Sequence, residues 1–158
     1  MARRFSTARA LTVGTLIVGT LDILDAFIFF GLRGVRPTAI LQSIASGVLG
    51  RAAYQGGART ATLGLLLHFL IAFSVVAVYL FAARALPWLN RRPLLYGMLY
   101  GVAVYVVMNF VVVPLSAAAL GSGPTPLAVR LNGILIHMLG VGLPAALVAA
   151  RAARDARR

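Results

Sequence analysis

The chain has 158 residues, of which 61% are hydrophobic and only three are acidic. The length suggests one domain, and the composition is that of a membrane protein rather than a soluble one. The absence of cysteine excludes disulfides and thiolate metal sites and leaves the compartment undecided.

Four apolar stretches are long enough to cross a membrane as helices. Such a helix needs about 20 residues to cover roughly 30 Å of hydrocarbon, and the stretches lie at about 11–30, 60–83, 94–113 and 131–150. The first is too long for the apolar core of a signal peptide, and no A-x-A-like cleavage site follows it. We therefore predict an all-α, integral-membrane bundle of four helices, forming a single transmembrane domain over residues 1–158.

The connection between the first two spans is predicted to contain a short helix at about 38–50. Pro37 suits its first turn and Gly50 its end. One face carries Ile40, Leu41, Ile44 and Val48, and the other carries Gln42, Ser43, Ser46 and Gly47. This pattern is typical of an amphipathic helix in the outer membrane interface, covering the interior of the bundle. A re-entrant segment is the alternative.

All fifteen basic residues are arginines, and they are distributed unequally over the two sides of the spans. Ten lie on the side of the termini: Arg3, Arg4, Arg9, Arg84, Arg91, Arg92, Arg151, Arg154, Arg157 and Arg158. Five lie on the other side: Arg33, Arg36, Arg51, Arg59 and Arg130. The positive-inside rule then places both termini in the cytoplasm. Because membrane topology and lipid contacts account for these arginines, we expect the lipid bilayer as a partner and no nucleic acid.

The polar residues within the spans are few and lie at similar depths. The candidates are Asp22, Asp25, His68, Tyr105, Asn109 and His137. At 1.5 Å per residue, the aspartates, the histidines and the asparagine lie about 2 to 8 Å outside the midplane. All except Asp25 also lie on stripes of small residues that suit helix packing, such as Ala61, Gly64, His68 and Ala72. We therefore expect these side chains to converge, with Asp25, about 60° around its helix from Asp22, nearer the outer mouth.

The two aspartates make the first span marginal as a membrane helix. On an insertion scale they cost roughly 5 to 7 kcal/mol together, while the Leu, Ile, Val and Phe residues of this span return about 4 to 7 kcal/mol. They therefore need polar partners or a proton. Hydrogen bonds that hold the helices together would satisfy them, and so would a proton relay, an ion path or a metal site.

Proton or cation handling by a small transporter, channel or sensor is the function that we favour for this cluster. Asp22 and Asp25 would bind the cation, and the two histidines would pass protons. A homo-oligomer or a larger membrane complex would help four helices to enclose a pathway. This reading needs no cofactor.

Three other functions fit the same residues. Haem b held by His68 and His137 would make a redox protein. Zinc held by His68, His137 and Asp22 would make an intramembrane hydrolase, although no H-E-x-x-H or G-x-S-x-G motif supports an enzyme. A non-catalytic accessory subunit would pair with a partner through the face of Gly97 and Gly101.

The sequence also resembles a group of small, uncharacterised four-helix bacterial inner-membrane proteins. The likeness lies in GTLDILDAFIFFGLRG (19–34), LHFLIAF (67–73) and YGVAVYVVMNFVVVPLSA (100–117) and covers most of the chain. It implies a multi-pass protein of the bacterial inner membrane and transfers no activity or functional residue.

Overall fold

The structure, a computed structural model, describes residues 6–118 and 125–156 as helices joined by short loops. Four helical spans are long and apolar enough to cross a membrane: α1 (Thr7–Gly31), α3 (Gly57–Ala85), Pro93–Leu115 and Leu127–Ala156. The predicted all-α bundle of four membrane-spanning helices is thereby confirmed. The first, second and fourth spans extend into arginine-containing flanks, because helical hydrogen bonding continues past the apolar stretch.

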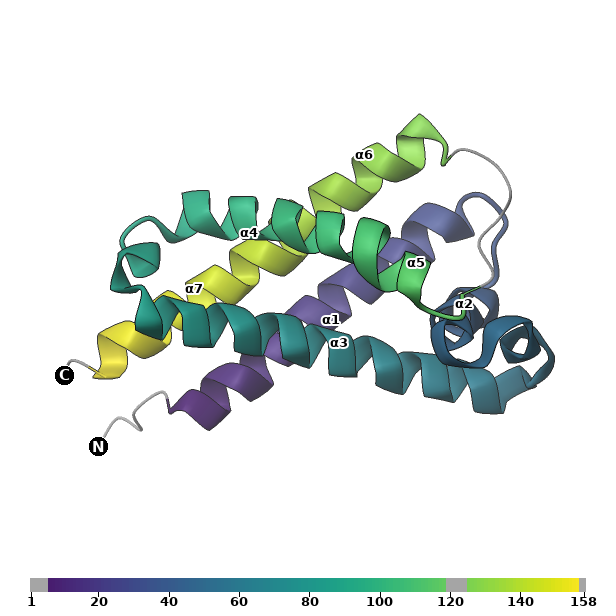
Figure 1. Ribbon diagram of the computed structural model, residues 1–158, viewed down its shortest axis with the longest axis horizontal. Coiled ribbons are helices and arrows are strands. Elements are labelled where there is room, and N and C mark those ends of the chain that lie inside the picture. The colour runs from purple at the N-terminus through teal and green to yellow at the C-terminus, as the bar shows by residue number, and fades with distance from the viewer. Residues whose placement is uncertain (1–5, 119–124, 157–158) are drawn as a thin grey trace.

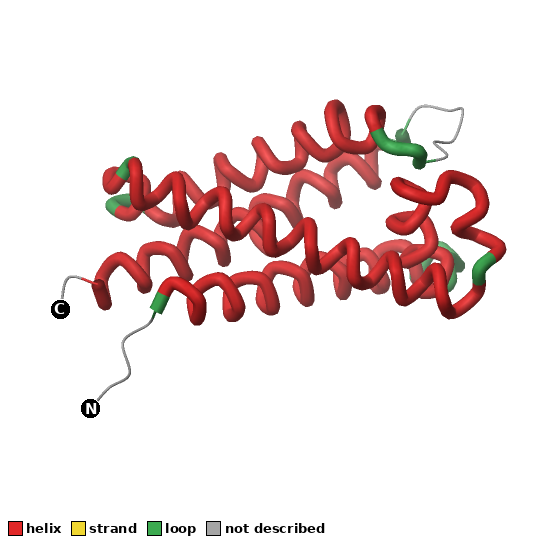
Figure 2. Tube along the Cα trace, turned by 60° about the horizontal axis from the view of Figure 1, so that its bottom comes forward, coloured by secondary structure: helices red, strands yellow, loops and turns green. Residues whose placement is uncertain are grey.

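The described ends of the spans meet at two opposite ends of the bundle. The start of α1, the end of the fourth span and η2 (Pro87–Asn90) lie at one, which we call the terminal end, while α2 (Pro37–Leu49) and η1 (Gly50–Gln55) lie at the other, the distal end (Figure 1). The described loops are confined to these ends (Figure 2). The predicted short helix between the first two spans is thus present as α2.

The third and fourth spans each contain a π-helical segment. The third consists of α4 (Pro93–Val107), η3 (Met108–Val112) and α5 (Val113–Leu115). The fourth consists of α6 (Leu127–Ile136), η4 (His137–Gly142) and α7 (Leu143–Ala156).

Proline accounts for both π segments. Val113 follows η3 and Leu143 follows η4, and the N–H of each bonds to the carbonyl five residues earlier. The next residue is a proline in both cases, Pro114 and Pro144. A proline has no N–H to donate, and its ring collides with the carbonyl four residues earlier, so the helix widens there.

Close backbone packing joins α4 to the fourth span. A Cβ atom on Gly101 would overlap the backbone carbonyl of His137, and one on Gly97 would lie 3.0 Å from the carbonyl oxygen of Gly142. The face of Gly97 and Gly101 is therefore occupied within the chain, as small residues allow. The accessory subunit considered from the sequence would therefore have to pair with a partner through another face.

The tightest packing lies in the terminal half of the bundle and uses small side chains. Its buried residues are Ala10, Val18, Ala72, Val76, Tyr79, Leu80, Ala83, Val104, Val141, Ala145, Ala146, Val148, Ala149 and Ala152. On α3, the stripe of Ala61, Gly64, His68 and Ala72 is buried as predicted. Alanine and valine at these positions let the spans approach closely along this half.

The buried side of α2 combines residues of both predicted faces. Ile40, Gln42, Ala45 and Ser46 are buried, whereas Ser43 is exposed and Val48 is 64% exposed. The Gln42 amide donates a hydrogen bond to the carbonyl of Gly57 at 3.1 Å, and a Cβ atom on Gly64 would overlap the backbone of Leu41. Gln42 is buried because it finds its partner on α3, and Val48 is left free for contact with lipid.

Candidate functional site

The distal half of the bundle surrounds a cavity of about 510 Å³, which we call the distal cavity. It extends from Val18 and Val141 at its base to Tyr54 and Thr125 near the distal end. Its lining includes all six polar residues selected from the sequence: Asp22, Asp25, His68, Tyr105, Asn109 and His137. Two of the three acids and both histidines of the chain therefore border one space, and no arginine of the described residues lines it.

The imidazole of His68 has one nitrogen fixed and one facing an acid. His68 is 8% exposed, and its Nε2 lies 2.8 Å from the backbone oxygen of Gly19. Because a carbonyl oxygen can only accept, Nε2 must carry the hydrogen and donate it. Nδ1 then faces the Asp22 Oδ2 atom at 3.9 Å, which is too far for a direct hydrogen bond.

This arrangement makes the contact between Asp22 and His68 most favourable when the two side chains carry one added proton. With His68 neutral, Nδ1 presents a lone pair to Asp22, and a lone pair facing a carboxylate is unfavourable. One added proton, on either residue, turns the repulsion into an attraction. The geometry suits one added proton on the pair, or a small donor group placed between the two side chains.

Asp25 has a partner that the sequence analysis missed. The Nδ2 atom of Asn132, on α6, donates a hydrogen bond to Asp25 Oδ2 at 2.7 Å. Asn132 stands at the edge of the predicted fourth span, where polar residues are common, and it was therefore not selected. The sequence did contain a signal, because Asn132 is a single amide residue at the same end of the bundle as Asp25, which needed a hydrogen-bond donor.

His137 begins the π segment η4 and lies against Tyr105. Its Nδ1 lies 2.8 Å from the carbonyl oxygen of Gly133, so Nδ1 donates and Nε2 is the nitrogen left for other partners. The rings of Tyr105 and His137 meet edge to face with their centroids 5.6 Å apart. Tyr105 lies over Gly133, where a Cβ atom would come 2.8 Å from the tyrosine ring.

Asn109 does not join the other polar residues as expected. It is exposed, and its amide donates to the carbonyl of Tyr105 at 2.9 Å, within its own helix. It borders the cavity but bonds to neither aspartate nor histidine. The π segment η3 begins one residue earlier, at Met108.

The cavity offers no assembled site for the two cofactors considered from the sequence. Within the described residues, no three His, Asp or Glu side chains lie close enough to hold a metal ion, so His68, His137 and Asp22 do not form a zinc site. Ligation of haem iron through His68 Nε2 would break its hydrogen bond to Gly19. The geometry therefore supports neither the hydrolase nor the haem protein.

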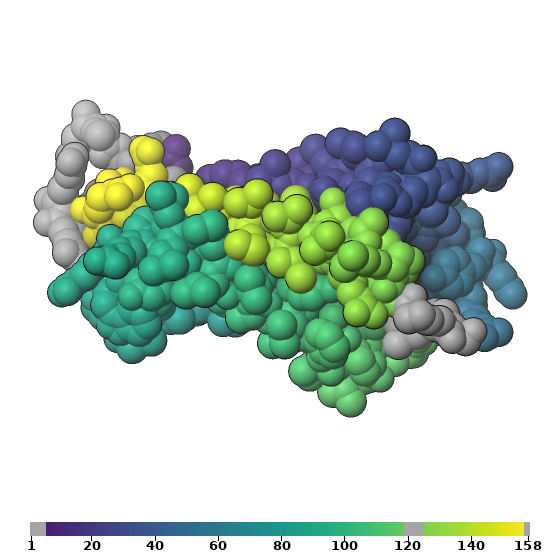
Figure 3. Space-filling view, turned by 90° about the horizontal axis from the view of Figure 1, so that it is seen from above, coloured from purple at the N-terminus to yellow at the C-terminus, as the bar shows by residue number. Residues whose placement is uncertain are grey.

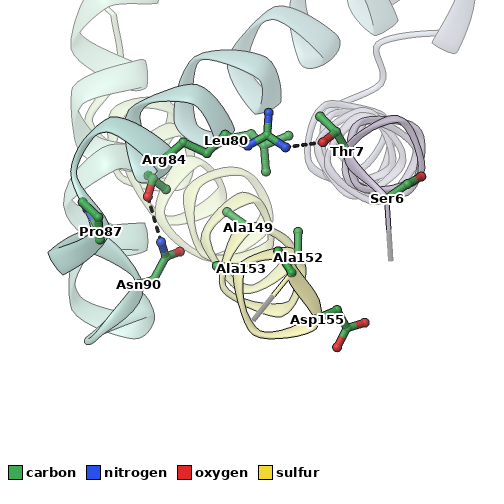
Figure 4. A pocket seen from close by; sticks show the side chains of 12 residues that line it. Ser6, Thr7, Leu80, Arg84, Pro87, Asn90, Ala149, Ala152, Ala153 and Asp155 are labelled. Atoms are coloured by element: carbon green, nitrogen blue, oxygen red, sulfur yellow. Dashed lines mark hydrogen bonds between the residues drawn. The ribbon is translucent and has the colours of Figure 1, made fainter. Parts of the chain in front are cut away.

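A second cavity, of about 460 Å³, lies at the terminal end (Figure 4). Asp155, the third acid, lines it together with alanines of α7. The Arg84 guanidinium donates to the Thr7 hydroxyl, and the Asn90 amide donates to the carbonyl of Ala83 at 2.8 Å. These contacts tie α1 and η2 to α3 at the terminal end.

A thin layer of buried side chains separates the two cavities. On α3, Val75 lines the distal cavity and Leu80 the terminal one, so they are five residues, or about 7.5 Å, apart along the helix. Val76 and Tyr79 between them are 1% and 2% exposed. The distal cavity is therefore closed toward the terminal end.

Comparison with known protein families, curated proteins and solved structures finds no match to this chain. Function must therefore be argued from the distal cavity itself.

Proposed function

We propose that this membrane protein binds a proton or another cation in its distal cavity, as a small transporter, channel or sensor. The observation that carries the proposal is the segregation of charge. Of the described residues, those lining the cavity include Asp22, Asp25, His68 and His137 but no arginine, in a chain with fifteen arginines. Ionisable residues inside a membrane bundle are costly and mark ion and proton paths.

Each polar residue has a distinct part in this proposal. Asp22 and His68 share the proton or hold the cation in its place. Asn132 keeps Asp25 oriented toward the mouth of the cavity through their 2.7 Å hydrogen bond. His137, with its Nε2 uncommitted, is the second group able to accept or release a proton.

The proposed location is a bacterial inner membrane, with both termini in the cytoplasm and the distal cavity on the outer side. The ten-to-five division of arginines between the two sides supports this orientation.

Proton flux into liposomes tests the proposed function. We expect Asp22→Asn to lower the flux by about tenfold or more, because the amide cannot exchange the proton that the acid shares with His68. Asp155→Asn is the matched control, since it removes the remaining acid of the chain from the terminal cavity. Gel filtration and circular dichroism establish that both variants fold.

Two outcomes would contradict this function. One is a wild-type flux no greater than that of empty liposomes. The other is an equal flux through the wild-type protein and Asp22→Asn. Either result would leave Asp22 and His68 with a structural role only.

A further inference from the structure

The volume of the distal cavity is much larger than an inorganic cation requires. A water molecule occupies about 30 Å³ of liquid, whereas the cavity measures about 510 Å³. Sites for small organic molecules typically have roughly 300 to 1,000 Å³. The cavity is therefore the size of a site for an organic ligand.

Most of the cavity wall is apolar. Every span contributes valine or isoleucine, for example Ile23, Ile71, Val104 and Ile136, and α2 adds Ile44. Water gains little from such surfaces, whereas an apolar molecule is favoured there. The wall is therefore complementary to a ligand whose body is apolar.

The polar part of the cavity selects positive charge. Asp22 and Asp25 lie one turn apart on α1, and Asp22 is 29% exposed, so a ligand can reach it. His68, which is 8% exposed, directs its Nδ1 toward Asp22 without reaching hydrogen-bond distance. The rings of Tyr54 and Tyr105 line the same space, and aromatic faces attract cations.

One wall of the cavity is only one helix thick. Met108 and Val112 of η3 line the cavity, while Phe110 and Val111 of the same segment are 71% and 46% exposed. The distal part of the third span projects from the body of the molecule (Figure 3, green). A ligand dissolved in the membrane would therefore be separated from the cavity by a single π-distorted helix.

From these observations, and resting on the proposed function, we infer that the cation of the distal cavity is an organic monocation with an apolar body. Its charge lies beside Asp22 and Asp25, and its apolar part lies against the valines and isoleucines of the four spans. Binding of such a cation displaces the proton shared by Asp22 and His68. The protein thus exchanges an organic cation for a proton at one site.

Equilibrium binding of tetraphenylphosphonium to the full chain in nanodiscs tests this inference. We expect saturable binding with release of about one proton per bound cation when the Asp22–His68 pair starts protonated. Asp22→Asn should weaken binding about tenfold or more and abolish the proton release. Tetramethylammonium, which has the charge without the apolar bulk, should bind about tenfold more weakly or worse, and Asp155→Asn should match the wild type.

A second variant separates the cavity volume from its charge. Ala26→Phe places a ring in the cavity one turn from Asp22 and keeps both acids. It should lose tetraphenylphosphonium binding and retain Asp22-dependent proton flux. Unchanged binding by Ala26→Phe, or by Asp22→Asn, would overturn the inference.

The inference and the proposed function can fail separately. If tetraphenylphosphonium does not bind while proton flux still depends on Asp22, the organic cation is wrong and the proposed function stands. If neither binding nor flux depends on Asp22, both are wrong.

Discussion

The backbone carbonyl of Gly19 determines which nitrogen of His68 faces Asp22. It occupies Nε2 at 2.8 Å, so only Nδ1 is directed at Asp22. The carbonyl can be reached because α1 and α3 approach closely here: a Cβ atom on Gly19 would lie 2.5 Å from the ring of Phe69. A glycine thus fixes the tautomer of a histidine on another helix.

The hydrogen bond between Asn132 and Asp25 links α6 to α1 and yields a prediction at the scale of residues. In a double-mutant cycle with Asp25→Ala and Asn132→Ala, we expect a coupling free energy of roughly 0.6 kcal/mol, and at most about 1.7 kcal/mol, as for other side-chain pairs in membrane helices. The measurement is the free energy of unfolding of the four proteins in mild detergent.

A matched pair controls this cycle. Asn109 also lies in the cavity, but its amide bonds within its own helix, so a cycle of Asp25→Ala with Asn109→Ala should give no coupling. Additive effects of Asp25→Ala and Asn132→Ala would show that their hydrogen bond does not contribute to stability.

At the scale of helices, the crossing of α4 and η4 has little room to adjust. Gly101→Ala forces a methyl group against the backbone of His137, and we expect a loss of roughly 1 to 3 kcal/mol in the free energy of unfolding, as for other overpacked positions. Gly31→Ala, where nothing lies within 4 Å of the added Cβ, is the control. Since alanine favours helix over glycine, equal stability gains in both variants would disprove the close crossing.

Hydropathy and length were sufficient to predict the four spans and α2, because both properties depend on local sequence alone. The inward-facing stripe of α3 was predictable for a similar reason, since its small residues recur with the helical period. The buried side of α2 was not, because it mixes both predicted faces: Ile40 is buried together with Gln42 and Ser46. The burial of Gln42 depends on its hydrogen bond to the carbonyl of Gly57, fifteen positions along the chain, and no periodicity records such a contact.

The sequence was sufficient to predict which residues line the distal cavity, but not which hydrogen bonds and ring contacts they make. Depth and helical stripes selected six residues that border the distal cavity. They gave no indication of the π segments, of the hydrogen bond that Asn109 makes within its own helix, or of the contact between His137 and Tyr105. Pro114 and Pro144 were visible signs of distortion, whereas the pairing of Asn132 with Asp25 required three-dimensional structure.

At the scale of the whole molecule, acidic and basic residues are distributed unequally between the two ends of the bundle. The acids Asp22 and Asp25 line the distal cavity, while the sequence assigns ten of the fifteen arginines to the side of the termini. Arginines near a membrane surface gain about 1 kcal/mol each from anionic lipids. We therefore expect one orientation of the bundle, with the distal cavity on the side opposite the cytoplasm.

That orientation can be measured with single cysteines, because the chain has none of its own. Leu32→Cys lies at the distal end, where Leu32 is 83% exposed, and Ala156→Cys lies at the exposed end of α7. In intact cells, a membrane-impermeant maleimide should label Leu32→Cys and not Ala156→Cys, since the arginine-rich side stays in the cytoplasm. Lysis should expose both positions and serves as the control. Labelling of Ala156→Cys alone in intact cells would reverse the orientation and open the distal cavity toward the cytoplasm.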